Sequence, residues 1–204
     1  MKYMRGDNVL RIISGRRRGY KLAAPDGLDT RPTTDRVKES VFNIIQTRLP
    51  CGFVLDMFAG SGAMGIEALS RGAAGAVFAE QNPASYKITE ANLTGSGLSS
   101  GAVLFKTDAF RLIEQLANGT VAAVTGDGER FDPKSGFDII FLDPPYNKGL
   151  VTKALDEIRQ LNLLSENGVI VTETEVQGED ISDSDFKVIK EAKYGKTIIT
   201  VMQR

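Results

Sequence analysis

The 204-residue sequence contains no histidine, no tryptophan and a single cysteine, Cys51. Without histidine there is no Ser-His-Asp triad, no Cys-His pair and no imidazole general base or metal ligand. One cysteine permits neither an intrachain disulfide nor a multi-thiolate zinc site, so we expect no bound metal. The chemistry left to the chain is that of carboxylates, backbone groups, lysine, arginine, hydroxyls or a bound cofactor.

Long apolar runs are also absent. The longest strongly apolar stretches, such as Ile139–Leu142, have the length of a strand, far below the ~20 residues that a membrane-spanning helix needs. Arg11 interrupts the short apolar stretch near the start, so no signal peptide is predicted. The 42% apolar and 25% charged fractions are typical of globular proteins. We therefore expect a cytoplasmic protein without a membrane partner.

Positive and negative charges are almost equal in number over the whole chain, but they are unevenly distributed along it. The net charge is −1, from 25 basic and 26 acidic side chains. Residues 1–38 hold ten Lys or Arg and four Asp, a local charge of +6, which leaves 15 basic and 22 acidic side chains, or −7, for the other residues. This asymmetry predicts a basic arm attached to an acidic body.

The N-terminal segment is predicted to form a basic β-hairpin and a helix. Residues 9–13 and 20–22 favour strands, and Gly15 and Gly19 bracket the arginines between them. A helix is expected from Asp35 to about Thr47, with apolar side chains at helical spacing and a threonine at position 33 or 34 as its N-cap.

From position 53 onward, short apolar runs alternate with helical patterns, which indicates βαβ units and a mostly parallel sheet. The expected strands cover residues 53–56, 76–80, 103–106, 137–143, 168–174, 187–190 and 197–202. The expected helices cover residues 63–71, 83–93, 109–117 and 150–161. The last two strands are separated by hairpin spacing, so one of them is expected to run antiparallel. Residues 117–136 are predicted to be a long exposed or mobile loop.

The first motif is a strand-end acid followed by a glycine turn, V-L-D-M-F-A-G-S-G-A-M-G at residues 54–65. Gly60, Gly62 and Gly65 have the G-x-G-x-x-G spacing of dinucleotide sites in the required strand-turn-helix context. Glu80 follows 20 residues after Gly60, where a carboxylate can accept hydrogen bonds from ribose hydroxyls. Asp56 would repel a pyrophosphate but suits a ligand with a cationic amine, such as S-adenosylmethionine. The alternative is a glycine turn that serves packing alone.

The second motif, Asp143-Pro144-Pro145-Tyr146, lies at the C-terminal end of the expected fourth strand. Two successive prolines fix φ and leave carbonyls without a following amide donor, which makes a rigid acceptor platform. With Asp143, this platform can bind the two hydrogens of an exocyclic amine and stabilise the charge that develops as the nitrogen attacks a sulfonium methyl group. Tyr146 offers a face on which an extruded base can stack. The alternative is a Pro-Pro turn that only ends a strand.

In this order and at this separation, the two motifs resemble the class I S-adenosylmethionine-dependent methyltransferases of the amino-group type. Three stretches resemble the RsmD family more closely: G-R-R-R-G-Y-K-L (15–22), L-D-T-R-P-T-T-D-R-V-K-E-S-V-F-N-I (28–44) and D-M-F-A-G-S-G-A-M-G-I-E-A-L-S-R-G-A (56–73). Members of that family are bacterial enzymes that methylate the N2 amine of a guanine in 16S ribosomal RNA. The resemblance extends from about Val9 to the C-terminus.

The resemblance implies an α/β, Rossmann-like class I methyltransferase fold. Its sheet would have seven mostly parallel strands and an antiparallel last hairpin. The chain would divide into a small N-terminal hairpin and helix extension, residues 1–50, which binds RNA and covers the pocket, and a methyltransferase domain, residues 51–204. The cofactor would be S-adenosyl-L-methionine, with S-adenosylhomocysteine as product. The partner would be 16S rRNA or the assembling small ribosomal subunit, and we expect a monomer.

The resemblance also assigns site residues, with Glu80 at the ribose and Asp108 beside the adenine. Those assigned to the cofactor are Asp56, Phe58, Gly60, Gly62, Glu80, Gln81, Asp108 and Ala109. Those assigned to the guanine and to catalysis are Asp143, Pro144, Pro145 and Tyr146.

The basic run Arg16, Arg17 and Arg18, with Lys21, is either a phosphate-binding hairpin or a solvated basic turn. The resemblance favours RNA binding, with Arg31 and Arg36 as further contacts and the neighbouring Tyr20 as a stacking partner.

Other readings of the two motifs stay open. The D-P-P-Y motif also suits methylation of a DNA adenine or cytosine, or of a glutamine amide, although no segment remains for a DNA target-recognition domain. A non-catalytic RNA-binding assembly factor with this fold is a different class of alternative. A nicotinamide oxidoreductase is disfavoured by Asp56 and by the lack of an evident hydride-side acid. Cys51 follows Pro50, as does the nucleophile of cytosine-C5 methyltransferases, but it precedes the first strand, so we expect a packing residue.

Overall fold

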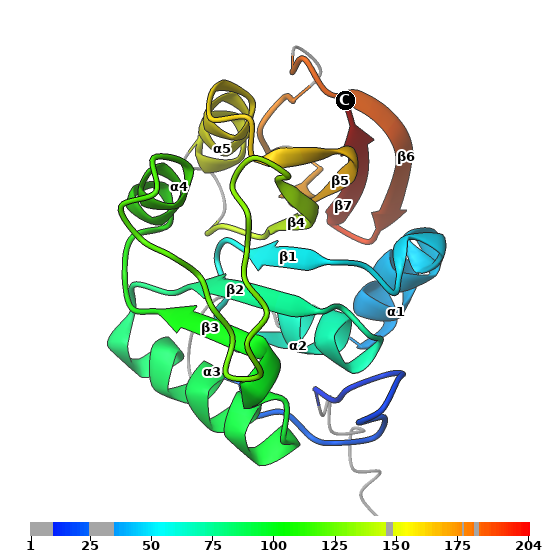
Figure 1. Cartoon of the computed structure of the whole chain (residues 1–204). Helices are drawn as coiled ribbons and strands as arrows, with labels where there is room; N and C mark the ends of the chain where they lie inside the picture. Colours follow the sequence, from blue (N-terminus) through cyan, green and yellow to red (C-terminus); the bar gives the residue numbers. More distant parts are fainter. Residues whose placement is uncertain (1–9, 25–34, 146–148, 177, 182–183) are drawn as a thin grey trace, which may run out of the picture.

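A computed structural model describes residues 10–24, 35–145, 149–176, 178–181 and 184–204. Its strands form one sheet in the order β3-β2-β1-β4-β5-β7-β6 (Figure 1). They are β1 (Phe53–Asp56), β2 (Gly75–Ala79), β3 (Ala102–Phe105), β4 (Phe137–Leu142), β5 (Leu164–Glu175), β6 (Lys187–Tyr194) and β7 (Thr197–Gln203). The helices are α1 (Asp35–Ile44), α2 (Ala63–Ser70), α3 (Pro83–Ser96), α4 (Ala109–Ala117) and α5 (Leu150–Gln160), with 3-10 turns η1 (Gln46–Arg48) and η2 (Ser99–Gly101).

The pairing of the strands confirms the expected topology. Strands β1 to β5 pair in parallel, whereas β7 runs antiparallel to both β5 and β6. Because β1 pairs with β2 on one side and with β4 on the other, the order of the strands reverses between β1 and β4. Strand β5 begins earlier than expected, at Leu164, and the expected strand at 187–190 extends to Tyr194.

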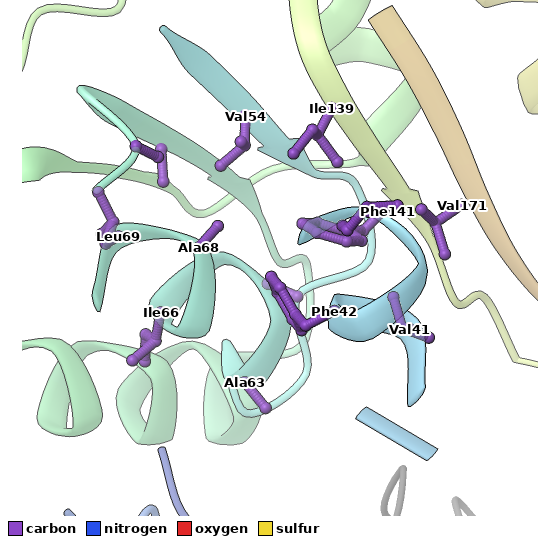
Figure 2. Close-up of a cluster of buried hydrophobic side chains, with 14 of the residues drawn as sticks. Val41, Phe42, Val54, Ala63, Ile66, Ala68, Leu69, Ile139, Phe141 and Val171 are labelled. Atoms are coloured by element: carbon purple, nitrogen blue, oxygen red, sulfur yellow. The ribbon is translucent and has the colours of Figure 1, made fainter. Parts of the chain in front are cut away.

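Two apolar clusters cover the two faces of the sheet. One cluster joins the sheet to α1, α2 and the N-terminal extension, and Figure 2 shows Phe42 of α1 close to Phe141 of β4, with ring centroids 5.7 Å apart. The other packs α4 and α5 on the opposite face. Sheet burial on both faces explains why the central strands are continuous apolar runs. The extension contributes Leu10, Ile12 and Leu22 to the first cluster.

Close packing of α2 on the sheet depends on Gly65. A Cβ built at this position would lie 2.3 Å from a ring carbon of Phe78 in β2, and Phe78 is fully buried. The residue is helical, so alanine would be favoured by backbone propensity alone. We expect Gly65→Ala to lower the free energy of unfolding by about 1–3 kcal/mol through overpacking, measured by urea titration.

Gly126→Ala is the matched control for that prediction, because its Cβ would meet its nearest atoms at 3.4 Å. An unchanged or raised midpoint for Gly65→Ala would show that α2 moves away from Phe78 without cost.

The extension is fixed to α2 by a buried carboxylate, Glu67. Its Oε2 accepts the backbone N–H of Ile13 at 2.7 Å, and its Oε1 accepts those of Ser14 at 2.9 Å and of the Arg71 side chain at 2.7 Å. The Nζ of Lys38 lies 3.5 Å from Oε2, and the side chains of Lys38 and Glu67 are both inaccessible to solvent. The hairpin and the helix α1 of the extension therefore meet α2 at one ion cluster.

The expected hairpin exists as a tight turn with one β-bridge, between Arg11 and Lys21, in place of two regular strands. Gly15 lies against the end of α2, where its Cβ would lie 1.9 Å from the carbonyl oxygen of Ser70. The Ser70 hydroxyl donates to the carbonyl of Ser14 at 2.6 Å. These contacts leave room only for glycine at position 15.

After Ala117, the last residue of α4, the segment up to position 136 forms the expected long loop and most of its residues are exposed, but a few buried side chains anchor it. Phe131 is buried and stacks on Phe137, with ring centroids 3.9 Å apart, and Ala123 is buried as well. The Asp127 amide donates to the carbonyl of Ser100 in η2 at 3.1 Å. The segment therefore packs against the sheet and η2, and apolar burial of two residues without periodicity holds it there.

Among the described residues, none of the helices is long and apolar enough to cross a membrane. The two-part division of the chain at position 50 stays a prediction.

Candidate active site

The two sequence motifs meet where the strand order reverses. Asp56 ends β1 in register with Phe141 of β4, and the amide of Met57 donates to the carbonyl of Phe141 at 3.1 Å. Asp143 and Pro144 come directly after Leu142, the last residue of β4. The crevice outside the carboxyl ends of strands at such a switch point is where open α/β sheets bind ligands.

The glycine turn after β1 has the conformation that its glycines predict. Gly60 and Gly62 have φ of 56° and 76°, in the left-handed region that favours glycine. The amide of Ala59 donates to the carbonyl of Ala79 in β2 at 3.0 Å, which holds the turn across the ends of both strands. The turn then leads into α2, whose N-cap is Gly62.

Asp56 is buried below this turn. It is 4% exposed, and its Oδ2 accepts the amide of Gly65 at 3.0 Å. Burial raises the pKa of the Asp56 carboxyl to about 7, the Gly65 hydrogen bond opposes this shift, and the nearby charge of Glu80 adds to it. A cationic group placed here would convert Asp56 to its charged form, so the environment suits a ligand with an ammonium group.

Glu80 closes the other side of the turn. Its Oε2 accepts the amide of Gly60 at 2.8 Å, and its Oε1 accepts the amide of Asn82 at 2.7 Å. Each carboxylate oxygen has a second lone pair that can accept a hydroxyl hydrogen. Gln81 beside it is exposed.

The end of β3 contributes the third edge of the crevice. Asp108 is the N-cap of α4, where its Oδ1 accepts the amides of Phe110 and Arg111 at 3.0 and 3.1 Å, and Ala109 behind it is buried. Phe58 is half-buried and meets the ring of Phe110 edge-on, with centroids 6.1 Å apart. These residues form an apolar wall bordered by one carboxylate.

Pro144 and Pro145 of the second motif line a small hollow that opens to solvent. Pro144 is buried and Asp143 and Pro145 are exposed, while Tyr146 lies outside the described residues. Carboxylates at the end of β5 and after it form much of the opposite wall. The lining residues are Pro144, Pro145, Val151, Glu173, Thr174, Glu175, Gly178 and Glu179.

The basic residues lie on the side of the extension. Arg16, Arg17, Arg18 and Lys21 are exposed, as is Arg36 in the first turn of α1. Their RNA-binding role stays a prediction. Arg31, with the expected N-cap threonines Thr33 and Thr34, lies outside the described residues.

Arg17 is engaged within the protein. Its guanidinium covers the C-terminal end of α3, since a Cβ on Gly97 would lie 2.5 Å from its Nη2. Tyr20 reaches the same helix, with its hydroxyl 2.1 Å from where a Cβ of Gly95 would be. Tyr20 is still 38% exposed, so its ring keeps an accessible surface.

Two residues that hold the glycine turn were not identified from the sequence, Thr89 and Asn92 of α3. The Thr89 hydroxyl donates to the carbonyl of Gly60 at 2.8 Å, and the Asn92 amide donates to that of Ser61 at 2.8 Å. In the sequence they are ordinary polar residues of a helix. A signal does exist in their spacing of three, which places both on the helix face that is buried.

Within the described parts of the chain, no three His, Cys, Asp or Glu side chains are grouped so that they could hold a metal ion. Cys51 lies before the N-terminal end of β1, whereas Asp143 follows the C-terminal end of the parallel strand β4, so the two residues lie at opposite ends of the strands. Burial, together with the charge of Asp138, raises the pKa of the Cys51 thiol to about 12. A thiol with so high a pKa is a poor nucleophile, which agrees with the expected packing role.

A seven-stranded sheet of this order, with β7 antiparallel beside β5, defines the class I methyltransferase fold. The putative methyltransferase yhhF from Escherichia coli has the same fold, with a TM-score of 0.76 and 32% identity over 95% of this chain and 97% of that one. Residues 10–203 match the family model described as conserved hypothetical protein 95. The chain belongs to this family, the RsmD family.

Curated relatives cover nearly the whole chain. The putative rRNA methyltransferase YlbH of Bacillus subtilis is 35% identical over 96% of this chain and 99% of its own length. The ribosomal RNA small subunit methyltransferase D of Escherichia coli K12 is 32% identical over 98% of this chain and 92% of its own length. The expected family and fold class are therefore confirmed.

Proposed function

We propose that this protein transfers a methyl group from S-adenosylmethionine to the exocyclic N2 amine of a guanine in 16S ribosomal RNA. The observation that carries the proposal is the meeting of two features at the β1/β4 switch: a buried acid under a glycine turn, and the Asp143-Pro144-Pro145 platform. The names of the curated relatives, an rRNA methyltransferase and a small subunit rRNA methyltransferase, support an RNA substrate.

The residues around the turn fit this cofactor. The carboxyl group of Asp56 suits an ammonium group better than a phosphate. Glu80 keeps lone pairs that can accept hydrogen bonds from ribose hydroxyls. The wall formed by Phe58 and Phe110 offers apolar contact to an adenine. When bound, S-adenosylmethionine supplies an electrophilic sulfonium methyl group. A Cβ at Gly60 would have no atom nearer than 4.0 Å, whereas one at Gly62 would meet the side chain of Thr89 at 2.8 Å, so Gly62 allows α3 to pack closely against the turn.

The platform on the β4 side would position the nucleophile. Pro144 and Pro145 fix the backbone so that carbonyl oxygens and the Asp143 carboxylate can accept both hydrogens of an amine. These acceptors stabilise the positive charge that develops on nitrogen during in-line transfer, and no covalent intermediate or metal is required. The proton then leaves the product amine to an acceptor of the platform or to solvent.

The carboxylates around the hollow beside Pro144 favour guanine over adenine. Guanine presents two adjacent donors, N1–H and N2–H, on its Watson–Crick edge, whereas adenine presents a donor beside an acceptor. Carboxylates accept hydrogen bonds and do not donate them when ionised. The acidic lining from Glu173, Glu175 and Glu179 therefore suits an edge made of donors, although Oε2 of Glu179 already accepts the amide and the hydroxyl of Thr152.

The substrate is tested by methyl transfer from labelled S-adenosylmethionine to purified ribosomal RNA. Small-subunit RNA, free and in assembled subunits, is compared with large-subunit RNA at equal concentration. We expect label in small-subunit RNA in at least one of its two forms. Label in DNA or in a protein glutamine, with none in RNA, would replace the proposal by one of the other amino-methyltransferases.

The basic hairpin is expected to anchor the RNA through phosphates. Replacing Arg16, Arg17 and Arg18 by glutamine removes three exposed charges. The slope of log K against log salt should then fall in magnitude by up to about 2–3 units, at about 0.7–0.9 per phosphate contact, with weaker binding at low salt. The measurement is fluorescence anisotropy of labelled RNA across a salt series.

The matched control removes the same charge from β6, as Lys187, Lys190 and Lys193 replaced by glutamine, all exposed at the far edge of the sheet (Figure 1). An equal change of slope in both triple variants would mean that the hairpin affects RNA binding only through the net charge of the protein, which would contradict a specific contact with the RNA.

Cofactor binding is expected to release a proton below pH 7. With the pKa of Asp56 near 7, the carboxyl is protonated in the free protein at pH 6, and a bound ammonium group favours its ionised form. The affinity for S-adenosylmethionine should therefore rise by up to tenfold per pH unit from pH 5.5 to 6.5 and level off near pH 7. Calorimetry at pH 6 in two buffers of different ionisation enthalpy measures the released proton.

Asp56→Asn should bind the cofactor more weakly at pH 7.5 and show no proton release. An affinity for S-adenosylmethionine that is constant from pH 5.5 to 7 in the unaltered protein would contradict the pairing of Asp56 with the ammonium group.

A further inference from the structure

Helix α3 contacts both the cofactor turn and the N-terminal extension through one buried side chain, Asn92. Asn92 is 3% exposed, and its Nδ2 donates to the carbonyl of Ser61 at 2.8 Å and to that of Ala23 at 2.9 Å. Its Oδ1 accepts the amide of Ala23 at 2.8 Å. Both amide hydrogens and the carbonyl oxygen are thus used, two bonds for the extension and one for the cofactor turn.

The surroundings of Asn92 place the two ligand regions on consecutive turns of the same helix. One turn earlier, Thr89 donates to the carbonyl of Gly60 in the cofactor turn. One turn later, the Tyr20 hydroxyl lies against Gly95, and the Arg17 guanidinium lies against Gly97. Asn92 lies between these two sets of contacts and is bonded to both regions.

We propose that Asn92 is a positioning residue that couples cofactor binding at the glycine turn to RNA binding at the extension. The inference rests on the proposed function, which places S-adenosylmethionine at Gly60–Gly62 and RNA at the hairpin. A planar amide with all its groups bonded cannot follow a displacement of Ser61 without losing a bond to Ala23, and a buried unsatisfied group is costly. Each ligand that orders its own loop therefore orders the other, and the effect is reciprocal.

The experiment measures the dissociation constant of S-adenosylhomocysteine by calorimetry, alone and with a saturating small-subunit rRNA transcript. In the unaltered protein we expect RNA to tighten this binding at least about threefold. In Asn92→Ala both ligands should still bind, but the ratio of the dissociation constant without RNA to that with RNA should be close to one. A variant that keeps the full ratio, or an unaltered protein in which both ligands bind independently, would overturn the coupling role.

Ser96→Ala is the matched control on the same helix. Ser96 is 2% exposed, and its hydroxyl donates to the carbonyl of Leu93 within α3, so it contacts neither ligand region through this bond. The ratio of the dissociation constants without and with RNA should be the same in Ser96→Ala as in the unaltered protein. Loss of the ratio in Ser96→Ala as well would assign the effect to the stability of α3 and overturn a specific role for Asn92.

A second measurement uses the unaltered protein and does not depend on the folding of a variant. Hydrogen exchange of the Ala23 amide, which donates to Asn92, should slow at least about threefold when S-adenosylhomocysteine is added without RNA. An unchanged rate would overturn the coupling. Failure of the unaltered protein to bind S-adenosylhomocysteine or RNA at all is a separate result, which would overturn the proposed function together with the inference.

Discussion

Asp143→Ala should lower kcat at saturating cofactor by about 10²–10³-fold and leave the affinity for S-adenosylhomocysteine within about threefold. The carboxylate is proposed to stabilise the charge that develops on the amine in the transition state, and removal of one such group typically has this effect. The measurement is a methyl-transfer time course at saturating cofactor and RNA, with calorimetry for cofactor binding. Asp143→Asn keeps one acceptor oxygen and should lie between alanine and the unaltered protein.

Asp132→Ala provides the control for the loss of an exposed carboxylate. Asp132 lies in the segment between α4 and β4 and forms hydrogen bonds to its neighbours Lys134 and Ser135. The kcat of the Asp132→Ala variant should be unchanged. Full turnover by Asp143→Ala would remove the carboxylate from the reaction and leave the proline carbonyls as the acceptors.

Glu67→Ala should lower the free energy of unfolding by about 3–5 kcal/mol. The substitution removes the acceptor of the Ile13 and Ser14 amides and leaves the charge of Lys38 buried without its carboxylate, and breaking a buried ion pair on one side has a cost of this size. Urea unfolding measures the loss. Glu67→Gln, which keeps one acceptor oxygen, should lose less.

The loss in Glu67→Ala should also depend on pH. Burial already lowers the pKa of Lys38, an effect that the Glu67 carboxylate opposes, and removal of Glu67 lowers the pKa further. A folded-state pKa below that of the unfolded chain means that the unfolded state binds more protons. The variant should therefore regain stability as the pH rises.

Glu90→Ala, at an exposed position of α3, is the control and should change stability by less than about 0.5 kcal/mol. A loss below about 1 kcal/mol in Glu67→Ala would show that the extension is held by its apolar side chains, Leu10, Ile12 and Leu22, and not by the ion cluster.

The sequence was sufficient for those features that leave a local pattern. The glycine turn, the strand-end acid and the Asp-Pro-Pro run were identified because backbone conformation at Gly60 and Gly62 requires particular residues at fixed spacing. The mostly parallel sheet followed from the alternation of apolar runs with helical periods. These are properties of neighbouring residues, which a sequence displays directly.

What the sequence could not predict is partnership between distant positions. Lys38 and Glu67 are charged residues on helices α1 and α2. Such residues are usually solvated, yet here they form one buried cluster with backbone amides of the extension. Asn92 is equally unremarkable in sequence, and its bonds span 69 positions to Ala23 and 31 to Ser61. Only the fold brings these groups together.

The anchoring of the loop between α4 and β4 could not be predicted from the sequence for a related reason. Glycines and charged residues dominate the composition of this loop, whereas its fixed position comes from Phe131 stacking on Phe137 and from the burial of Ala123. Two buried apolar side chains in a segment without periodicity give no signal to a pattern-based prediction.

The chemical identity of the methylated nucleoside tests the central claim most directly. Small-subunit rRNA methylated by the purified protein is digested to nucleosides, and the product is compared with standards by chromatography and mass spectrometry. We predict N2-methylguanosine, and no product when transcripts carry inosine, which lacks the N2 amine, in place of guanosine. A methyl group on adenine, on cytosine or on a ring nitrogen of guanine would contradict the assignment of the Asp143 platform to the guanine amine.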